Sequence, residues 1–286
     1  MKIIDGKQLS ESIYIWIKQQ LQHIEKKPKL AIIQATKDES SLMYIKMKMK
    51  KAEELGIEVE VIEIPELSSA DDVIYKIHDL NTEMDVTGVM VQLPLYEHLE
   101  KDRDLILNTI ASNKDVDGLT YPSLGKTFFY QNDSILPATV DSIIECLRFS
   151  TNNNLFELRG KNVVILNNTN LIGKPLSVLL QKFNATVISA NEYTENLNNL
   201  TQNADVIVSA TGKTNLIDHT MIKEGAILID VTSKKVADES NPEGKIIGDI
   251  VRSEELDAKA GYITPVPGGV GPLTIACLLK NLVNLK

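Results

Sequence analysis

Cysteine is nearly absent from this chain, with two residues in 286. Cys146 and Cys277 are too few for a disulfide framework, and both lie in apolar helical patterns. We therefore expect two buried, reduced thiols in a cytoplasmic protein. No apolar run approaches the roughly 18 residues of a membrane-spanning helix, and the N-terminus has no signal-peptide pattern. These absences argue against a disulfide scaffold and against a membrane protein.

Basic residues are in the minority. The chain has 30 Lys and Arg against 39 Asp and Glu, a formal net charge of -9, so binding to nucleic acid has no overall electrostatic support. An anionic ligand would need a local basic patch. The sequence shows no internal repeat and no low-complexity tract, and we predict no metal site. The composition, 43% hydrophobic and 24% charged, is that of an ordinary globular protein.

Helical and strand patterns alternate along the chain, which indicates α/β domains with parallel sheets. In the first half, the sequence predicts helices at 7–24, 41–55 and 70–80, and strands at 30–33, 57–64 and 86–91. A loop is predicted from Asn113 to Tyr130, and a helix at 139–149. A second alternating run has strands near 162–166, 185–189, 205–209 and 226–230. This second run is typical of a dinucleotide-binding domain.

The predicted fold class is α/β, with two α/β domains around a cleft, the second of them Rossmann-like. We expect the first domain to span 1–141 and to include a C-terminal helix at 270–286. The second is expected at 142–269.

Polar residues of the first half fall where α/β proteins place ligands. Tyr44 and Lys48 lie one turn apart on the predicted helix 41–55, on a stripe beside the expected core positions Leu42, Ile45, Met49 and Ala52. Gln92 follows the end of a predicted strand, and Asp117 lies in a loop. Each has a simpler alternative. A lysine beside an apolar stripe is often a surface residue, and aspartates before glycine often serve only the turn.

The segment Thr264–Thr274 contains three prolines and three glycines in eleven residues. It cannot be a helix or a central strand. A short apolar pair precedes it and an apolar helical pattern follows. The segment is either an ordinary strand-to-helix corner or a loop that faces a ligand, and its glycine and proline content favours the second.

Four separated segments occur in one order and at matching intervals: Tyr44 to Lys48, Val91 to Leu95, Lys114 to Gly118 and Thr264 to Thr274. In these segments, and in its opening residues 3–7, the sequence resembles the bifunctional methylenetetrahydrofolate dehydrogenase/cyclohydrolase family. The resemblance covers essentially the whole chain.

The resemblance implies two reactions of one-carbon metabolism, of the kind that supplies purine biosynthesis. Methylenetetrahydrofolate gives a hydride to a nicotinamide cofactor, and water then opens the methenyl cation to formyltetrahydrofolate. Lys48 would be the catalytic lysine and Gln92 would orient it. Tyr44 would pack against the folate, and Asp117 would accept hydrogen bonds from the pterin edge. The other implied substrate contacts are Ser41, Pro267, Gly268 and Gly269.

The family's cofactor turn, roughly Gly-Arg-Ser-x-x-x-Gly-x-Pro, is altered here. Asn167 and Asn168 replace the glycine and the arginine, whereas Thr169 matches the serine in kind. Gly173 and Pro175 match outright. With Lys174 between them, these residues would meet the pyrophosphate at a helix start. Near the end of a later strand, Thr211 and Gly212 complete the predicted cofactor contacts.

The motif residues leave the choice of cofactor open. Family members usually take NADP, but Asn168 carries no charge for the 2′-phosphate. Glu192 stands where the family often has a serine, and a carboxylate about twenty residues past the phosphate turn is an NAD signature. Alternatively, Glu192 is a solvated loop residue and Lys174 supplies the cation. We predict an NAD preference or relaxed selectivity.

Three functions remain possible from the sequence. The first is the bifunctional enzyme, with tetrahydrofolate substrates. The second is a monofunctional dehydrogenase, against which the retained Lys48 and Gln92 argue. The third is a non-catalytic folate-binding paralogue, which only the altered turn supports. By analogy with the family we expect a homodimer through the cofactor domain, with no nucleic acid or membrane partner.

Overall fold

The computed structural model describes residues 1–238 and 241–285. The chain forms two compact units, one of Met1–Ser10 with Thr139–Thr274, the other of Glu11–Ala138 with Ile275–Lys286. The predicted boundaries differ from these at both ends of the chain. The first ten residues belong with the later unit because β1 (Lys2–Ile3) pairs in parallel with β11 (Tyr262–Ile263).

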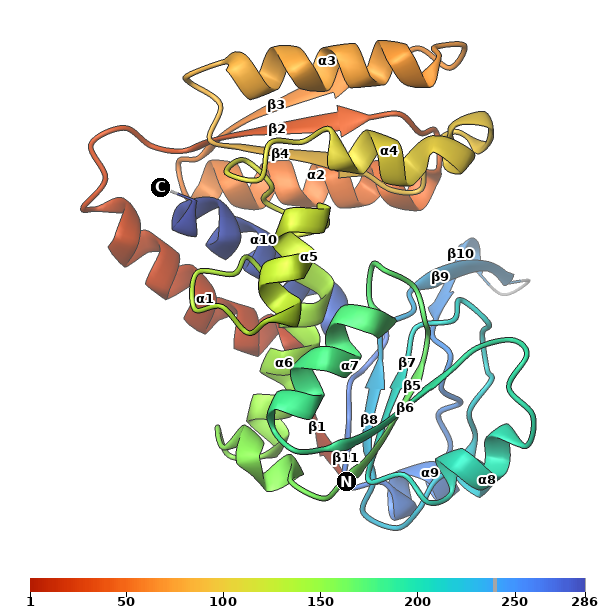
Figure 1. Cartoon of the computed structure of the whole chain (residues 1–286). Helices are drawn as coiled ribbons and strands as arrows, with labels where there is room; N and C mark the ends of the chain where they lie inside the picture. The colour runs from red at the N-terminus through yellow and green to blue at the C-terminus, as the bar shows by residue number, and fades with distance from the viewer. Residues whose placement is uncertain (239–240, 286) are drawn as a thin grey trace. The chain divides into compact units, whose positions relative to one another are not determined.

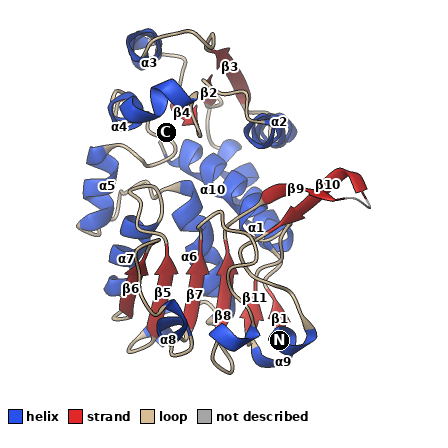
Figure 2. Ribbon diagram, turned by 90° about the vertical axis from the view of Figure 1, so that its right-hand side faces the viewer, coloured by secondary structure: helices blue, strands red, loops and turns tan. Residues whose placement is uncertain are grey.

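The unit of Glu11–Ala138 contains a parallel three-stranded sheet in the order β3-β2-β4. Its strands are β2 (Lys29–Gln34), β3 (Glu58–Glu63) and β4 (Gly88–Gln92). The helices α2 (Glu39–Glu54) and α3 (Ala70–Thr82) lie on opposite sides of this sheet (Figures 1 and 2). Every residue of β4 is buried, as expected for a strand covered on both faces.

The core of this unit joins the two ends of the chain. Buried residues of α1 (Gly6–Leu21) and α10 (Val270–Asn284), with Tyr14, Ile17, Leu279 and Leu282 among them, form one cluster with Leu30 and Ile32 of β2. Residues 275–279 and 281–283 of α10 are accordingly buried. The predicted return of the C-terminal helix to the first domain is found here from Ile275 onward.

The segment between β4 and residue 138 is more helical than the sequence indicated. It contains the short helices η1 (Glu97–Asp102), α4 (Arg103–Asn108) and α5 (Tyr121–Phe128). The prediction of a continuous loop from 113 to 130 was wrong for α5. The Thr120 side chain accepts a hydrogen bond from the Ser123 backbone, and a proline occupies the first turn, so the start of this helix carries ordinary capping signals.

The later unit contains a six-stranded parallel sheet in the order β1-β11-β8-β7-β5-β6, whose arrows all point the same way in Figure 2. The remaining strands are β5 (Asn162–Leu166), β6 (Thr186–Ala190), β7 (Val206–Ser209) and β8 (Ile227–Asp230), each within one residue of its prediction. The accompanying helices are α6 (Ala138–Ser150), η2 (Leu155–Leu158), α7 (Gly173–Lys182), α8 (Leu197–Thr201), η3 (His219–Met221) and α9 (Glu254–Lys259).

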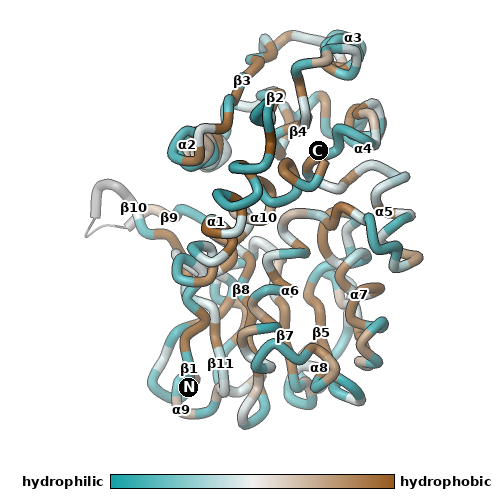
Figure 3. The backbone as a smooth tube through the Cα atoms, turned by 90° about the vertical axis from the view of Figure 1, so that its left-hand side faces the viewer, coloured by the Kyte–Doolittle hydropathy of each residue, from teal (hydrophilic) through white to brown (hydrophobic). Residues whose placement is uncertain are grey.

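The strand order of this sheet reverses at β5. β6 pairs with one edge of β5 and β7 with the other, so the chain moves first one way and then the other across the sheet. Ligands of open α/β sheets bind beyond the carboxyl ends of the strands at such a switch point. The strands are mostly apolar (brown in Figure 3) and supply the core, whereas polar residues follow their carboxyl ends. An antiparallel pair, β9 (Lys234–Asp238) and β10 (Asn241–Ile247), follows β8.

The start of α1 can be tested through Gly6. A methyl group added at Gly6 would lie 1.7 Å from the carbonyl oxygen of Gly269, a backbone atom that cannot easily move aside. We expect Gly6→Ala to lower the free energy of unfolding by about 1–3 kcal/mol in urea unfolding, as overpacking usually does. Gly125→Ala is the control, because its methyl group would meet nothing within 4 Å. Equal stability of the two variants would contradict the close approach.

Candidate active site

Lys48 lies on the buried face of α2, whereas the prediction placed it on a stripe beside that face. The buried residues of this helix are Ser41, Ile45, Lys48 and Ala52. The predicted core position Met49 was wrong, since 40% of its surface is exposed, and Leu42 is only partly buried. Lys48 takes the place expected of an apolar residue, and 7% of its surface is exposed. Its position therefore cannot be that of a surface lysine.

The Lys48 amine is held by two residues of β4. Its Nζ donates to Oε1 of Gln92 over 2.8 Å and lies 3.7 Å from the sulfur of Met90. Met90 and Gln92 are two residues apart on a strand, so both side chains project from the same face. Gln92 also donates from Nε2 to the carbonyl oxygen of Leu93 over 2.8 Å. That second bond fixes the orientation of the amide, with its oxygen toward the lysine.

Burial changes the protonation of both ionisable groups here. Desolvation lowers the pKa of Lys48 to about 8, against a smaller opposing effect of the Asp117 charge. Desolvation raises the pKa of Asp117 to about 6, although Lys48 and the backbone N–H of Ala138 both favour its charged form. Lys48, Gln92 and Asp117 are therefore brought together, and the lysine is partly neutral near neutral pH.

The two aspartates of the loop have different tasks. Asp115 is buried and its carboxylate accepts hydrogen bonds from the backbone of Gly118 and Thr120 at 2.9 Å each, with a longer one from Leu119. Asp115 is thus the turn residue that the simpler alternative described. Because Asp115 accepts from these N–H groups, the Asp117 carboxylate is left for other partners.

The loop is also held against the sheet and the last helix. Residue 115 forms a parallel bridge with Val89 of β4, which carries Asp117 toward the end of that strand. Buried Asn281 of α10 donates to the carbonyl oxygens of Val116 and Leu136. Sequence reasoning missed Asn281, because a polar residue on an apolar helix gives no sign of its partner.

Ser41 and Tyr44, both predicted substrate contacts, lie on the same helix as Lys48. The Ser41 hydroxyl oxygen lies within hydrogen-bond distance of two acceptors, the Leu93 carbonyl oxygen at 3.0 Å and the Asp38 carboxylate at 2.9 Å. It thereby connects the start of α2 to the end of β4. Tyr44 is partly buried and packs against the core cluster.

In the later unit, the turn after β5 is closed by the side chain of Asn167. Its Oδ1 accepts from the backbone N–H groups of Thr169 (2.9 Å) and Gly173 (3.0 Å) and from the Thr169 hydroxyl (2.8 Å). Its Nδ2 donates to the carbonyl oxygen of Ala210 at 2.8 Å, beyond the end of β7. Gly173 has to be glycine, because a methyl group there would lie 2.0 Å from the Asn167 carbonyl oxygen.

The remaining predicted cofactor residues surround this turn. Asn168, Lys174 and Glu192 are exposed, whereas Pro175 is buried in the first turn of α7. The Lys174 amine donates to Oδ1 of Asn170 at 2.7 Å. Beyond β7, Gly212 has a φ of +70°, a conformation that favours glycine.

A pair of buried aspartates supports the end of β7 and β8. Asp249 accepts on one oxygen from Ser209 and from the backbone and hydroxyl of Thr211. In the described part of the chain, its other oxygen is buried and has no hydrogen-bond partner. Asp230 accepts from the backbone of Thr232 and Ile250, and burial raises its pKa to about 6. Sequence reasoning did not single out Asp249, which lies about 40 residues after its partners.

The glycine- and proline-rich segment lies in the later unit, directly after β11. The Thr264 hydroxyl at its start accepts from the Asp230 backbone over 2.7 Å. Pro267 is exposed, Gly268 has a φ of +108°, and Gly269 is buried against Pro265. The predicted substrate contacts Pro267, Gly268 and Gly269 are therefore in a different unit from Lys48 and Asp117.

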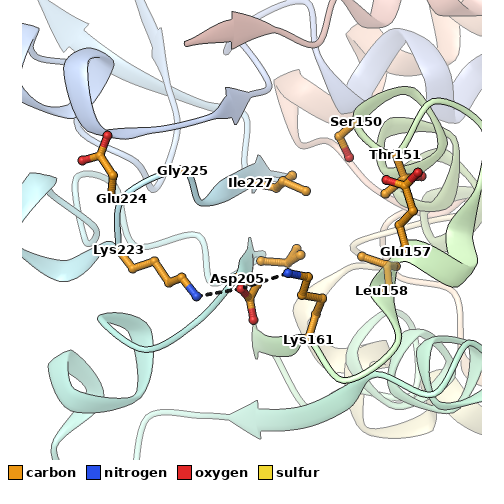
Figure 4. Close-up of a pocket in the computed structure, with 11 residues that line it drawn as sticks. Ser150, Thr151, Glu157, Leu158, Lys161, Asp205, Lys223, Glu224, Gly225 and Ile227 are labelled. Carbon is orange, nitrogen blue, oxygen red and sulfur yellow. Dashed lines mark hydrogen bonds and ion pairs between the residues drawn. The ribbon is translucent and has the colours of Figure 1, made fainter.

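A pocket of about 360 Å³ opens at the end of the Rossmann-like sheet that is opposite to the turn after β5 (Figure 4). It lies at the amino ends of β5, β7 and β8. The Asp205 carboxylate in it pairs with Lys223 at 2.6 Å and with Lys161 at 3.9 Å. None of the predicted site residues lines this pocket. Its charged groups connect neighbouring loops and are not part of the site after β5.

Residues 1–238 and 241–285 contain neither a metal-binding cluster nor a membrane-spanning helix. No group of three or more His, Cys, Asp or Glu in these ranges is arranged to hold a metal ion. No helix in them is long and apolar enough to cross a membrane.

Two family models match the chain. The model for the tetrahydrofolate dehydrogenase/cyclohydrolase catalytic domain covers residues 4–117, and the model for the NAD(P)-binding domain of the same family covers 137–286. The chain belongs to the tetrahydrofolate dehydrogenase/cyclohydrolase family. This confirms the resemblance that the sequence motifs indicated.

Full-length relatives agree with this membership. The chain is 39% identical over 287 residues to the bifunctional protein FolD of Lactobacillus acidophilus, covering 99% of this chain and 96% of that protein. The crystal structure of the bifunctional enzyme FolD from Campylobacter jejuni matches with a TM-score of 0.89, at 38% identity, over 100% of this chain and 98% of the other. That of Trypanosoma brucei FolD, complexed with NADP and an inhibitor, matches with a TM-score of 0.91, at 31% identity, over 99% and 96%.

The residues of the later unit fit a dinucleotide in their architecture. The parallel sheet has its switch point between β5 and β7, and Gly173 lets the turn approach the start of α7 closely. The family's NAD(P)-binding domain spans this region. However, the N–H groups of Thr169 and Gly173 already donate to the Asn167 side chain. A phosphate could accept from these two N–H groups only after the Asn167 side chain had moved away.

The raised pKa of Asp230 predicts a dependence of stability on pH. Between the ordinary value of 3.8 and about 6, the folded protein retains a proton that the unfolded chain has released. The stabilisation is therefore complete below pH 4 and is lost as the pH rises through 6. Asparagine does not titrate, so we expect the free energy of unfolding of Asp230→Asn not to fall in this way. Relative to wild type, it should rise by up to about 3 kcal/mol between pH 4 and 7.

The measurement is urea unfolding of both proteins across that range. Asp72→Asn is the control with the opposite sign, because hydrogen bonds from Ser69 lower the pKa of Asp72. A constant difference between Asp230→Asn and wild type at every pH would contradict the raised pKa.

Proposed function

We propose that this protein oxidises 5,10-methylenetetrahydrofolate to methenyltetrahydrofolate with a nicotinamide cofactor and hydrolyses the product to 10-formyltetrahydrofolate. The observation that carries the proposal is the buried Lys48 amine on Gln92, with the Asp117 carboxylate near it. Hydride transfer requires the positioning of two carbon centres and no acid or base. The hydrolysis is the step for which this chain supplies a proton acceptor.

Lys48 is suited to activate water. With a pKa of about 8, roughly a quarter of the amine is neutral at pH 7.5, against about a thousandth for an ordinary lysine. The neutral amine takes a proton from the water that attacks the methenyl carbon. The resulting ammonium can return that proton to the ring nitrogen as the carbon–nitrogen bond opens, while the hydroxyl of the adduct releases its proton to solvent and becomes the formyl carbonyl. Gln92 keeps Nζ in place during both transfers, because its oxygen accepts a hydrogen bond from either form.

Asp117 would bind the pterin of the folate, and Tyr44 would bind its aromatic middle. A carboxylate accepts two hydrogen bonds from the 2-amino and ring N–H edge of a pterin. Tyr44, partly buried one turn before Lys48, offers a ring face to the aromatic middle of the substrate. The substrate carbon would then lie near the lysine between these contacts. By analogy with the family, we further propose that Pro267, Gly268 and Gly269 contact the substrate.

A monofunctional dehydrogenase is the weaker alternative, because an enzyme without hydrolysis has no need of a buried lysine held by an amide. By analogy with the family, we propose a cytoplasmic homodimer. Size-exclusion chromatography with light scattering tests the dimer.

Replacing Lys48 separates binding from hydrolysis. We expect Lys48→Met to reduce methenyltetrahydrofolate hydrolysis to the uncatalysed rate, while folate and cofactor still bind, because the methionine fills the space and lacks the amine. In wild type, the hydrolysis rate is expected to rise with pH to about 8, as the amine becomes neutral. Spectrophotometric decay of the methenyl compound measures both. Lys46→Met, an exposed position on the same helix, is the control. Near-normal hydrolysis in Lys48→Met would exclude this role.

The cofactor preference depends on Asn168 and Glu192. Both are exposed after neighbouring strands, where a 2′-phosphate would meet the Glu192 carboxylate, while Asn168 carries no charge. We expect wild type to use NAD at least as well as NADP in kcat/KM. The double change Asn168→Arg with Glu192→Ser should shift the ratio toward NADP by roughly tenfold or more, the effect of a charged hydrogen bond. A strong NADP preference in wild type would show that another group, with Lys174 the first to test, binds the phosphate.

A further inference from the structure

Three successive backbone N–H groups at the start of α7 already have hydrogen-bond partners. Gly173 N–H donates to the Asn167 side chain, Ile172 N–H to the Thr169 hydroxyl, and Lys174 N–H to the Thr169 carbonyl oxygen. The next residue, Pro175, has no N–H. The N–H groups of residues 172–174 are therefore all bonded within the turn itself.

The Asn167 carboxamide has the position and the bonds of a bound anion. Its oxygen accepts three hydrogen bonds, two from Thr169 and one from Gly173, all between 2.8 and 3.0 Å. A dinucleotide pyrophosphate is normally received by such N–H groups at a helix start. A glycine, which the family pattern has at this position, carries no side chain to compete for them.

We propose that the Asn167 side chain is an internal substitute for the cofactor pyrophosphate, and that it must leave Thr169 and Gly173 before a dinucleotide binds. The inference rests on the proposed cofactor turn and names the residue that sets its affinity. The substitute holds the turn together in the free protein. It also weakens the binding of a diphosphate, since each ligand bond to Thr169 or Gly173 replaces an existing one.

A further hydrogen bond, donated by the side-chain amide of Asn167, keeps this side chain in place. Asn167 Nδ2 donates to the Ala210 carbonyl oxygen, so the side chain spans the switch point from the end of β5 to the segment after β7. Ser189 of β6 donates to the Asn167 carbonyl oxygen, which fixes its backbone as well. The carboxamide can therefore leave the donors by rotation of its side chain, while the backbone of the turn stays where it is.

The test is the affinity of ADP, which carries the diphosphate without the nicotinamide, measured by titration calorimetry on the full-length protein. We expect Asn167→Ala to bind ADP roughly three- to tenfold more tightly than wild type, because ADP no longer has to displace a side chain worth about one net hydrogen bond. Asn167→Asp should bind it more weakly, because a carboxylate holds the same donors more strongly and repels the diphosphate. NAD should follow the same order.

Stability supplies a second readout. Asn167→Ala should lower Tm in the absence of ligand, and saturating ADP should raise its Tm by more than it raises that of wild type. Asn154→Ala is the matched control. Its side chain also accepts a backbone N–H, that of Phe156, but at the start of η2. It should lose stability without any change in ADP affinity.

Weaker ADP binding in both Asn167 variants would overturn the proposal, because a residue that only supports the turn, or that contacts the phosphate directly, gives this result. Absence of ADP binding to Asn167→Ala would overturn it as well. Failure of the proposed enzyme function is a separate outcome. It would appear as missing methylenetetrahydrofolate oxidation or methenyl hydrolysis, whatever the order of the ADP affinities.

Discussion

The buried hydrogen bond between Lys48 and Gln92 is the interaction on which the candidate chemistry depends. An amine on the core face of α2 loses its water, and this loss lowers its pKa to about 8. The amide oxygen of Gln92 gives the amine one well-placed acceptor without adding a charge, so burial is tolerated and the neutral form stays accessible. A carboxylate in that position would have raised the pKa again and kept the lysine charged.

The loops that follow the strands share a second feature, which is that acceptors within the chain hold their N–H groups. Asp115 does this for the turn that carries Asp117, Asp249 for Thr211, and Asn167 for the start of α7. The first two arrangements fix a loop after a strand, and the first leaves the neighbouring Asp117 carboxylate without those donors. The third occupies the donors that a ligand would use, so the same device has the opposite consequence for binding.

Much of the architecture follows from periodicity. The strands and principal helices were predicted close to their observed bounds, because continuous apolar runs and helical stripes report directly on burial. The helix α5 was missed, since a short helix with a polar start resembles a loop in its composition. The first ten residues were assigned to the wrong unit, because a two-residue strand such as β1 reveals nothing about its partner until β11 is placed beside it.

The sequence by itself determined the two α/β units, the family, and the residue types of the site, since each depends on local pattern or on motifs in fixed order. Only the tertiary structure decided which side chains are buried and what they contact. It placed Lys48 on the core face and Met49 outside it, gave Asp115 and Asp117 different partners, and closed the turn after β5 with Asn167. These outcomes depend on distances between residues far apart in the chain, and a one-dimensional pattern does not contain those distances.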